Sequence, residues 1–421
     1  MNKFSERIKQ IIKEGPLGIY LMAFLIPLND NWLGFGVLII ILEQIIRRTP
    51  IKKANIKAQL TWRNPGIWLF MFYLMHVVGL IHTENMAFAG MDLGMKSTIA
   101  IFPVFFLLYQ PVVRWRLFMQ FFILGAFVSI AVNLSLAMGY YLEVKNIRYL
   151  TGSFISQLMH RGYWALYLLI AYLFLLKSGV DSQFKKSSII HFFGAFLIAF
   201  FIVLSESRVG YIGLALISIW EIGRYVKMFK NKWIIPVVTG VFIGCIILVY
   251  NFLPSAANRV TSTIESLVTP KENVKEAETD ATSVRLFLWE SSVELIQENF
   301  WFGVGTGDVK DEFIQKNLDK EYLVLAEMRF NSHNQFLNSH IALGVFGSLF
   351  LLLSVVTNFL KLKPDPLRSY RVWIVLMLFL ALLPESMLEV QAGIIPYAFL
   401  LSFLTAFKPK LKQKDCHVSQ Y

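Results

Sequence analysis

Long apolar runs recur along the chain from Pro16 to Phe407, separated by short polar stretches. Many of them approach the roughly 20 residues that a helix needs to cross a bilayer. They stay apolar throughout, whereas the strands of an outer-membrane barrel alternate between apolar and polar residues. The pattern therefore predicts an all-α integral membrane protein. Its twelve predicted spans lie near 17–28, 32–46, 66–83, 97–110, 116–138, 159–177, 188–205, 209–225, 233–253, 336–360, 370–384 and 392–407.

Three of these runs, 17–28, 32–46 and 97–110, are short for a complete crossing. We expect such a run to lie with little tilt, to extend into its flanking residues, or to pair with a neighbour as a helical hairpin. No small-residue cleavage site follows the first run, so we interpret it as a retained span and not as a signal peptide.

The longest polar interruption divides the chain into three parts. Residues 1–253 contain spans one to nine, residues 254–335 form one long loop, and residues 336–421 contain spans ten to twelve and a basic tail. Within the long loop, the stretch 270–282 is charged and poor in apolar residues, which predicts a linker. No internal repeat is evident, which speaks against an inverted-repeat transporter.

A helix is predicted to follow this linker and to run to about Asn299, with Thr282 or Ser283 as its N-cap. Its apolar face is expected to consist of Leu286, Trp289, Val293 and Ile296. After the glycine-rich run 303–307, a second helical stretch is expected over 308–328. We therefore expect the long loop to form a small helical cap on the membrane surface.

The charge distribution predicts the topology. The chain is 56% hydrophobic and 16% charged, with a net charge of +12. If alternate loops are assigned to the cytoplasm from the N-terminus onward, 27 of the 40 Lys and Arg residues fall on that side. By the positive-inside rule, both termini are cytoplasmic and the long loop is periplasmic, in a multi-pass protein of a bacterial inner membrane. The basic balance is thus a topology signal and does not indicate nucleic-acid binding.

Two arginines outside the predicted cytoplasmic loops are candidates for chemistry. Arg208 follows Ser205, Glu206 and Ser207 at the junction of spans seven and eight, where a charge is costly unless it is paired. It either has a function there, or it snorkels to the interface or pairs with Glu206. Arg285 lies near the expected start of the helix in the long loop, where the helix dipole disfavours a cation but helps to bind an anion. A solvated surface arginine is the alternative.

A third candidate is the polar run 331–335 (Asn-Ser-His-Asn-Gln), immediately before an apolar span. His333 could act as a general base, or donate to a phosphate or sugar oxygen. His340 would share a helix face with it. The alternative is an interfacial cluster that is bonded to backbone and water.

Other signals are discounted. The glycines at 303–307 lie in no strand–turn–helix context, so we reject nucleotide binding. No spacing of His, Cys, Asp and Glu predicts a metal site. Cys245 is expected within a span and Cys416 in the tail, so no disulfide is expected. The aromatic residues are interpreted as interfacial belts and lipid-facing packing.

Three motifs follow one another in a fixed order. They are Ser207-Arg208-Val209-Gly210; Arg285 and Trp289 followed by the run 299–305 (Asn-Phe-Trp-Phe-Gly-Val-Gly); and the run 332–337 (Ser-His-Asn-Gln-Phe-Leu) leading to Gly344 and Gly347. In these motifs the chain resembles the O-antigen ligase/polymerase superfamily of membrane glycosyltransferases, over roughly 195–410. The family usually has Pro where this chain has Phe300, which puts only the end of the preceding helix in doubt.

The resemblance implies a GT-C-like fold and a hexosyltransferase-type, polyprenyl-diphosphate-dependent enzyme. Such proteins transfer a glycan from an undecaprenyl diphosphate carrier to an acceptor on the periplasmic face, without a metal or another cofactor. Ligases use the lipid A–core oligosaccharide as the acceptor, and polymerases use another lipid-linked glycan. Membrane lipids and these two glycans are therefore the expected partners, and nucleic acid is not.

The candidate residues fit this chemistry. Without Mg²⁺, a cation must offset the charge on a departing diphosphate, and Arg208 and Arg285 could do so by bidentate hydrogen bonds. His333 would orient or deprotonate the acceptor hydroxyl, and direct displacement predicts inversion at the anomeric carbon. Further substrate contacts are expected from Ser207, Trp289 and Asn334, which belong to the same motifs.

The alternatives to a ligase are a polymerase of the same superfamily, a transporter and a structural scaffold. A single large loop outside the cytoplasm, with a short loop at 139–158, favours a ligase over a polymerase. A transporter for lipid-linked sugars would need ionisable residues deep within its spans, whereas Glu43 and Glu221 lie near predicted cytoplasmic ends. A structural scaffold would give no reason for the set of two arginines and a histidine.

Overall fold

The computed structural model describes residues 15–48, 50–51, 56–57, 59–181, 186–228, 254–269, 271, 273–277, 280–360, 367–406 and 408–409. The chain divides into two compact units. Unit 1 comprises Met1–Ile26, Asp30–Phe121 and Lys271–Tyr421, and unit 2 comprises Pro27–Asn29 and Phe122–Pro270. The predicted ninth span, 233–253, lies outside the described residues.

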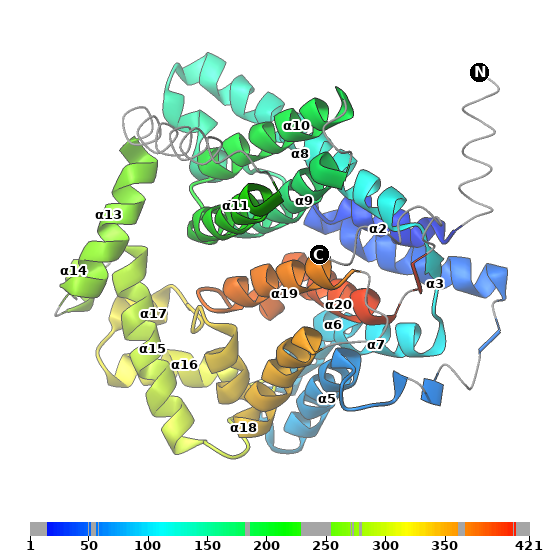
Figure 1. The fold of residues 1–421 in the computed structure, drawn as a ribbon. Coiled ribbons are helices and arrows are strands. Elements are labelled where there is room, and N and C mark those ends of the chain that lie inside the picture. The colour runs from blue at the N-terminus through cyan, green and yellow to red at the C-terminus, as the bar shows by residue number, and fades with distance from the viewer. Residues whose placement is uncertain are drawn as a thin grey trace. The chain divides into compact units, whose positions relative to one another are not determined.

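Unit 1 is built almost entirely of helices. They are α2 (Leu17–Leu25), α3 (Leu33–Arg47), α5 (Pro65–Val78), α6 (Met86–Lys96), α7 (Thr98–Leu108), α14 (Val274–Ala277), α15 (Ala281–Glu298), α16 (Val309–Asp319), α17 (Leu323–Glu327), α18 (Gln335–Val356), α19 (Arg368–Leu382) and α20 (Gln391–Ala406) (Figure 1). Short 3₁₀ turns are η1 (Asp30–Trp32), η2 (Gly79–His82), η5 (Thr357–Phe359) and η6 (Met387–Glu389). The strands found in the described part of the chain, β1 (Val112–Val113) and β2 (Lys408–Pro409), pair in parallel.

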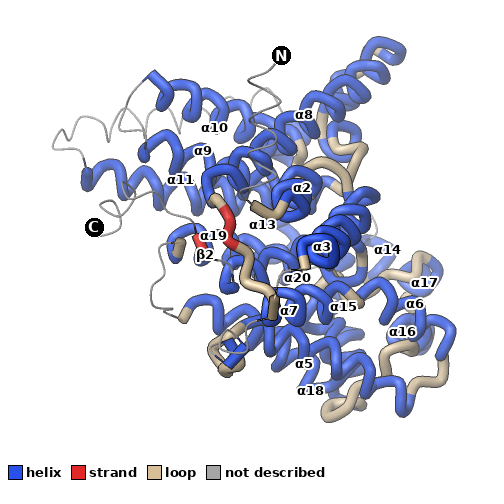
Figure 2. Tube along the Cα trace, turned by 90° about the vertical axis from the view of Figure 1, so that its right-hand side faces the viewer, coloured by secondary structure: helices blue, strands red, loops and turns tan. Residues whose placement is uncertain are grey.

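The core of unit 1 consists of α5, α7, α18 and α20. Helix α5 packs against α18 and α7, and α7 packs against α20; α5 and α18 run side by side in both ribbon views (Figures 1 and 2). Phe102 and Phe106 of α7 face Phe399 and Phe403 of α20, with ring centroids 5.3 to 5.9 Å apart. Burying large aromatic side chains in this way contributes much of the packing energy of a core.

The first two short apolar runs, 17–28 and 32–46, form a helical hairpin, which is one of the arrangements expected for them. Helix α2 packs against α3. The carboxylate of Glu43 on α3 accepts hydrogen bonds from the amides of Leu17 and Gly18, at 2.8 and 2.7 Å. These amides are at the N-terminus of α2, where no intrahelical acceptor exists, so Glu43 serves as a cap from a neighbouring helix.

Unit 2 is also helical. Its elements are the later part of α8 (Trp115–Val144), the turns η3 (Ile147–Leu150) and η4 (Gly152–Ile155), and helices α9 (Arg161–Asp181), α10 (Lys186–Leu204), α11 (Arg208–Met228) and α13 (Pro254–Val268). Helix α9 packs against α10 and α11. Its polar side chains are paired: Trp164 donates to Ser129 at 2.8 Å, and Lys177 lies 3.3 Å from Glu221.

Among the described residues, five helical stretches are long and apolar enough to cross a membrane: Pro65–His82, Met86–Leu108, Trp115–Val144, Arg161–Gly179 and Gln335–Phe359. Ser188–Leu204 and Gln391–Ala406 are shorter apolar helices. The expected all-α membrane architecture is therefore confirmed, and the count of twelve spans stays a prediction. The short run 97–110 extends into its N-terminal flank, because α6 and α7 together form one span that includes Asp92 and Lys96.

The first helix predicted in the long loop is α15, and Asn299 is its C-cap as expected. The predicted N-cap is wrong, because Asp280 accepts from the amides of Thr282 and Ser283 at 3.3 and 2.8 Å. An aspartate caps as well as a serine and has a longer reach. The second predicted stretch is confirmed as α16 and α17, and the described part of the expected linker contains the helical turn α14.

The buried face of α15 differs from the predicted apolar face, of which Leu286, Trp289 and Ile296 are half-buried. Val293 is exposed. The buried residues of the helix are Thr282, Ser283, Leu288, Ser291, Ser292 and Leu295. The two central serines are small and their hydroxyls are satisfied: Ser291 donates to Asn317 of α16 at 2.9 Å, and Ser292 donates to the Leu288 carbonyl at 2.6 Å. A buried hydroxyl is tolerated when it is hydrogen-bonded. The spacing of apolar residues therefore did not predict which face of α15 is buried.

Helix α18 is interrupted at Gly344, where φ is 65° and ψ is −160°. The run 299–305 lies against this break: the amides of Val304 and Gly305 donate to carbonyls of α18, at 2.8 and 3.1 Å. A Cβ at Gly303 or Gly344 would overlap the backbone of the opposite segment. These glycines allow the backbones of the two segments to touch. The resulting hydrogen bonds satisfy backbone groups of α18 that would lack a partner at the break, which a membrane-spanning helix could not tolerate.

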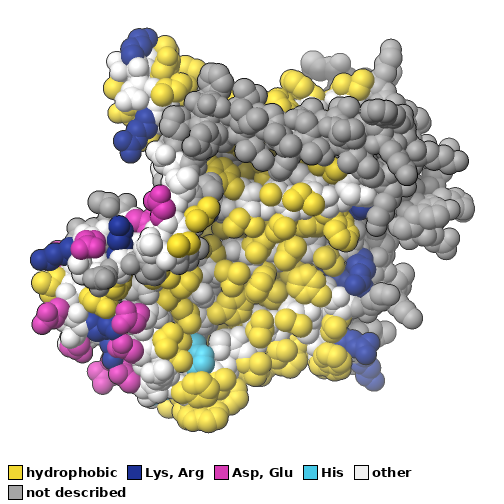
Figure 3. Space-filling model, turned by 60° about the vertical axis from the view of Figure 1, so that its left-hand side comes forward, with side chains coloured by type: hydrophobic (Ala, Val, Ile, Leu, Met, Phe, Trp, Pro, Cys, Tyr) yellow, Lys and Arg dark blue, Asp and Glu magenta, His cyan; other side chains and the backbone are white. Residues whose placement is uncertain are grey.

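The molecular surface separates polar from apolar areas. In the face drawn in Figure 3, acidic and basic side chains gather at the lower left, and hydrophobic side chains cover a broad area to their right. A continuous apolar area of this size is unusual on a soluble protein and is expected where lipid is the solvent.

Candidate functional site

A carboxylate that the sequence analysis did not single out joins two of its candidate residues. Glu385, in the loop between α19 and α20, lies 3.0 Å from Nδ1 of His333 and 3.5 Å from Nη2 of Arg285. The three side chains are 27%, 24% and 21% exposed, so they are partly reachable from outside. The structure thus brings a base and a cation together around one acid, all in unit 1.

Arg285 is fixed by backbone carbonyls as well as by Glu385. Its Nε donates to the Pro384 carbonyl at 3.0 Å, and its Nη1 donates to the Ala281 carbonyl at 3.2 Å. Arg285 lies in the second turn of α15, further from the start of the helix than expected. The guanidinium therefore connects the helix of the long loop to the α19–α20 loop, and two of its five donor hydrogens go to backbone.

His333 occupies a strained turn directly before α18. Its φ is +44°, which is unusual for a residue with a Cβ and is found preferentially at functional sites. Its amide donates to Asn331 Oδ1 at 2.9 Å, and Asn334 caps the amides of Phe336 and Leu337. An ionised Glu385 accepts from Nδ1, and this tautomer leaves Nε2 as the proton acceptor.

The motif residues next to the site have mixed roles. The amide oxygen of Asn334 is used as the N-cap of α18, so a substrate contact would have to come from its NH₂ group. Trp289 lies one turn after Arg285 on α15, and its indole N–H is buried without a hydrogen-bond partner among the described residues. A buried donor without a partner is rare in proteins and is a candidate for binding a ligand.

The second predicted cation, Arg208, belongs to unit 2. It is the first residue of α11. Ser207 caps this helix by accepting from the Gly210 amide at 3.2 Å. Glu206 has a φ of +52° and its carboxylate lies 3.9 Å from Nη1 of Arg161. The junction therefore carries two arginines and a strained glutamate, and roles of Ser207 and Arg208 in catalysis stay predictions.

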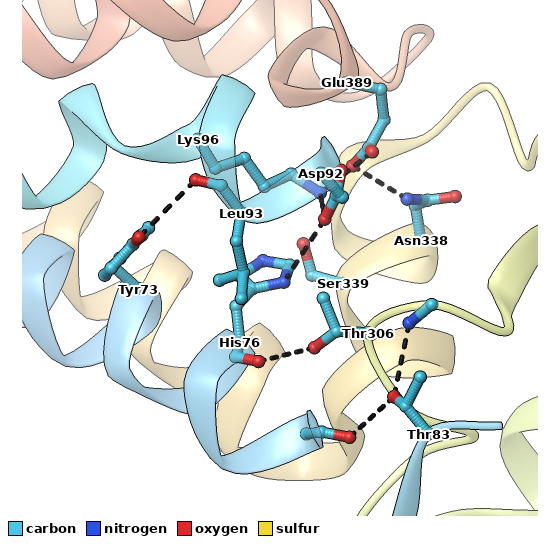
Figure 4. A network of polar contacts seen from close by, with 12 residues as sticks. Tyr73, His76, Thr83, Asp92, Leu93, Lys96, Thr306, Asn338, Ser339 and Glu389 are labelled. Atoms are coloured by element: carbon cyan, nitrogen blue, oxygen red, sulfur yellow. Dashed lines mark hydrogen bonds and ion pairs between the residues drawn. The ribbon is translucent and has the colours of Figure 1, made fainter. Parts of the chain in front are cut away.

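A buried ion network in unit 1 was missed by sequence reasoning. It consists of His76 on α5, Asp92 and Lys96 on α6, and Glu389 in η6 (Figure 4). Lys96 Nζ lies 2.8 Å from Asp92 and 2.9 Å from Glu389, and His76 Nδ1 lies 3.8 Å from Asp92. The available signal was an acid and a lysine four residues apart in an otherwise apolar run.

The network reaches the helix that follows His333. Glu389 Oε1 accepts from Asn338 at 2.9 Å and from Gln335 at 3.2 Å, both on α18. Gln335 in turn accepts from the Leu388 amide at 2.6 Å. Glu385 and Glu389 therefore bind the start of α18 from the two ends of one short loop.

A second, exposed group of charges holds the long loop together. Lys320 donates to Glu290 and Glu294 of α15, at 2.7 and 2.5 Å, and Lys316 donates to Glu298. Burial lowers the pKa of Lys320, but the hydrogen bonds to Glu290 and Glu294 outweigh it, so the pKa lies above its ordinary value. These pairs fix the segment from which Arg285 extends.

No group of three or more His, Cys, Asp or Glu side chains with metal-binding geometry occurs within the described ranges.

Comparison with known proteins supports the motifs. Residues 193–352 match the sequence model of the family described as O-antigen ligase. The resemblance to the O-antigen ligase/polymerase superfamily is thus confirmed over this segment, which includes Arg208, Arg285 and His333. Glu385 and the buried ion network lie outside it.

A curated relative is also similar. An uncharacterized protein of Haemophilus influenzae is 27% identical over 173 residues, which are 41% of this chain and 43% of that protein. The matched part thus spans less than half of the length of the relative.

Proposed function

We propose that this protein is an O-antigen ligase-type glycosyltransferase. It moves a glycan from an undecaprenyl diphosphate carrier to the lipid A–core oligosaccharide on the periplasmic face of a bacterial inner membrane. The observation that carries the proposal is the contact of one carboxylate, Glu385, with both His333 and Arg285. A proton acceptor and an anion-binding cation are thereby held side by side, as group transfer from a diphosphate requires.

Arg285 binds the diphosphate in this proposal. Its Nε and Nη1 each donate to a backbone carbonyl, and Nη2 forms an ion pair with Glu385 at 3.5 Å. A guanidinium has five donor hydrogens, so further donors on its terminal nitrogens serve the phosphate oxygens in this proposal. Such bonds strengthen as charge develops on the leaving group, so they lower the barrier more than they tighten donor binding. A role of Arg208 as a second cation stays a prediction from its motif.

His333 acts as the general base. Its Nε2 takes the proton of the acceptor hydroxyl as the oxygen forms its bond to the anomeric carbon. The bond from that carbon to the carrier diphosphate breaks, and the diphosphate leaves with the electron pair. Glu385 holds the imidazole in the required tautomer and stabilises the imidazolium that forms. Direct displacement inverts the configuration at the anomeric carbon.

The test is single-turnover transfer by the purified full-length protein with an undecaprenyl diphosphate-linked glycan and lipid A–core. Arg285→Lys is expected to slow transfer because an ammonium cannot form two parallel bonds. The loss of one charge-assisted contact costs about 2–4 kcal/mol in the transition state, or roughly 30- to 1000-fold in rate. His333→Ala should impair transfer while donor affinity is retained. Parental transfer rates in both variants would refute the proposed site.

A deletion strain separates ligase from polymerase. A strain without this ligase loses long-chain lipopolysaccharide and accumulates carrier-linked polymer. Lipopolysaccharide capped with a single repeat would instead identify a polymerase.

A further inference from the structure

The α19–α20 loop, which carries Glu385, is held at both ends. Near its start, the Pro384 carbonyl accepts from Arg285 Nε, as described above. The opposite end is held by Glu389, whose carboxylate accepts from Lys96 of α6 at 2.9 Å and from side chains of α18. The loop thus links the base and the diphosphate-binding cation to a lysine that lies on another helix.

Lys96 is an unusually strong point of attachment. The side chains of Lys96, Asp92 and Glu389 are 3%, 2% and 21% exposed, so the ammonium has little access to water. A buried ammonium without partners costs several kcal/mol, and attraction to carboxylates is correspondingly strong at low dielectric. One carboxylate, Asp92, is on the same helix as Lys96, so it can neutralise the lysine without constraining the loop. Of the two bonds that Lys96 makes to carboxylates, the bond to Glu389 is the one that restrains the loop.

A shift of Glu389 would also move Glu385. The Glu389 amide donates to the Ser386 carbonyl at 3.2 Å, which closes a tight turn between them. Ser386 Oγ lies 3.4 Å from Ser332 Oγ, next to His333. The close approach of Gly393 to the Met387 carbonyl leaves no room for the turn to move toward α20.

We infer that Lys96 is a positioning residue for glycan transfer. Through Glu389 it fixes the α19–α20 loop so that Glu385 stays on His333, and it touches neither donor nor acceptor. This inference rests on the proposed function.

Two matched variants separate positioning from a plain structural role. Glu389→Gln and Asp92→Asn each remove the charge of one of the two carboxylates that bind Lys96, so that one carboxylate partner remains. Both replacements keep the shape of the side chain. A structural role predicts the larger loss of stability and activity for Asp92→Asn, because Asp92 is the more buried carboxylate. Positioning predicts the opposite order for the turnover number.

The expected result for Glu389→Gln is a fall in kcat of about 100-fold, the usual consequence of misplacing a catalytic group by about 1 Å. KM for the lipid-linked donor should change little, because donor contacts are retained. Asp92→Asn should transfer at close to the parental rate. In a Glu385→Gln background, Glu389→Gln should add little further loss, because both changes act through the same residue.

A readout that needs no activity accompanies the kinetics. Hydrogen–deuterium exchange at the amides of Leu388 and Glu389 should speed up in Glu389→Gln and stay at the parental level in Asp92→Asn. Unchanged exchange, or a kcat loss that is as large in Asp92→Asn, would overturn the inference. If exchange responds as expected but the parental protein transfers no glycan from a polyprenyl diphosphate, the loop restraint is supported and the proposed function fails.

Discussion

Replacing Glu385 by Gln should slow glycan transfer strongly and leave the protein folded. The carboxylate lies 3.0 Å from His333 Nδ1 and 3.5 Å from Arg285 Nη2, so both partners lose a charge-assisted contact. The amide has nearly the same volume, but its NH₂ group can donate to Nδ1 and select the tautomer in which Nε2 is already protonated. That tautomer cannot accept the hydroxyl proton of the acceptor.

The magnitude follows from the geometry. A hydrogen bond to a charged group contributes about 1.5–3 kcal/mol, so the loss of the contact to His333 predicts a rate reduction of roughly 10- to 150-fold. The effect on stability should be smaller. All three side chains are between 21% and 27% exposed, and ion pairs with this access to water are worth about 0–1 kcal/mol.

The assay is single-turnover transfer with saturating donor, alongside donor affinity and thermal unfolding in detergent. Asp319, an exposed acid of α16, provides a control variant, Asp319→Asn, which should behave as the parental protein. A Glu385→Gln variant that transfers at the parental rate would show that the acid does not serve the base. A large drop in unfolding temperature would show that Glu385 is chiefly structural.

The remaining predictions rest on the charge distribution of the sequence as well as on the structure. Transfer should persist in excess EDTA, because we assign the offset of diphosphate charge to arginines, and restoration of lost activity by Mg²⁺ would contradict this. Reporter fusions after Lys57 should read as cytoplasmic and fusions after Glu321 as periplasmic, and the reverse at Glu321 would overturn the topology. Gly393→Ala should lower stability by about 1–3 kcal/mol, measured by thermal unfolding, because its Cβ would overlap the Met387 carbonyl. Because the pKa of Lys320 is raised in the folded protein, its ion pairs stabilise the fold fully at pH values below the ordinary lysine pKa of 10.5. This contribution is lost as the pH rises through the folded-state pKa. Lys320→Met should remove that part of the pH dependence, measured as the free energy of unfolding.

The helices could be predicted well from the sequence because a lipid solvent requires long, continuous apolar segments. Continuous apolar runs of near-spanning length have few alternative structures in a membrane. The apolar face of α15 was mispredicted because hydropathy cannot show that Ser291 and Ser292 are satisfied by Asn317 and by a backbone carbonyl. The fourth span was predicted to start at residue 97 for a related reason. Charged residues such as Asp92 and Lys96 indicate a loop unless their pairing is known.

The site was predicted in part. Arg285 and His333 stand in motifs, and the structure brings them together. Glu385 is 52 residues from His333 in a loop without a motif, so only the tertiary fold could identify it as a partner. The same holds for Lys96 and Glu389, which are 293 residues apart.

The position of Glu385 has a consequence for biosynthesis. Arg285 precedes its backbone partner Pro384 by 99 residues. At roughly 5–20 residues per second, a ribosome needs about 5–20 s to make the intervening chain. Late in this interval the arginine and the histidine have both been made, yet the acid that pairs with both has not. The centre is therefore assembled late, when the α19–α20 segment is made, and under the proposed function a nascent chain could not transfer a glycan before its last helices are in place.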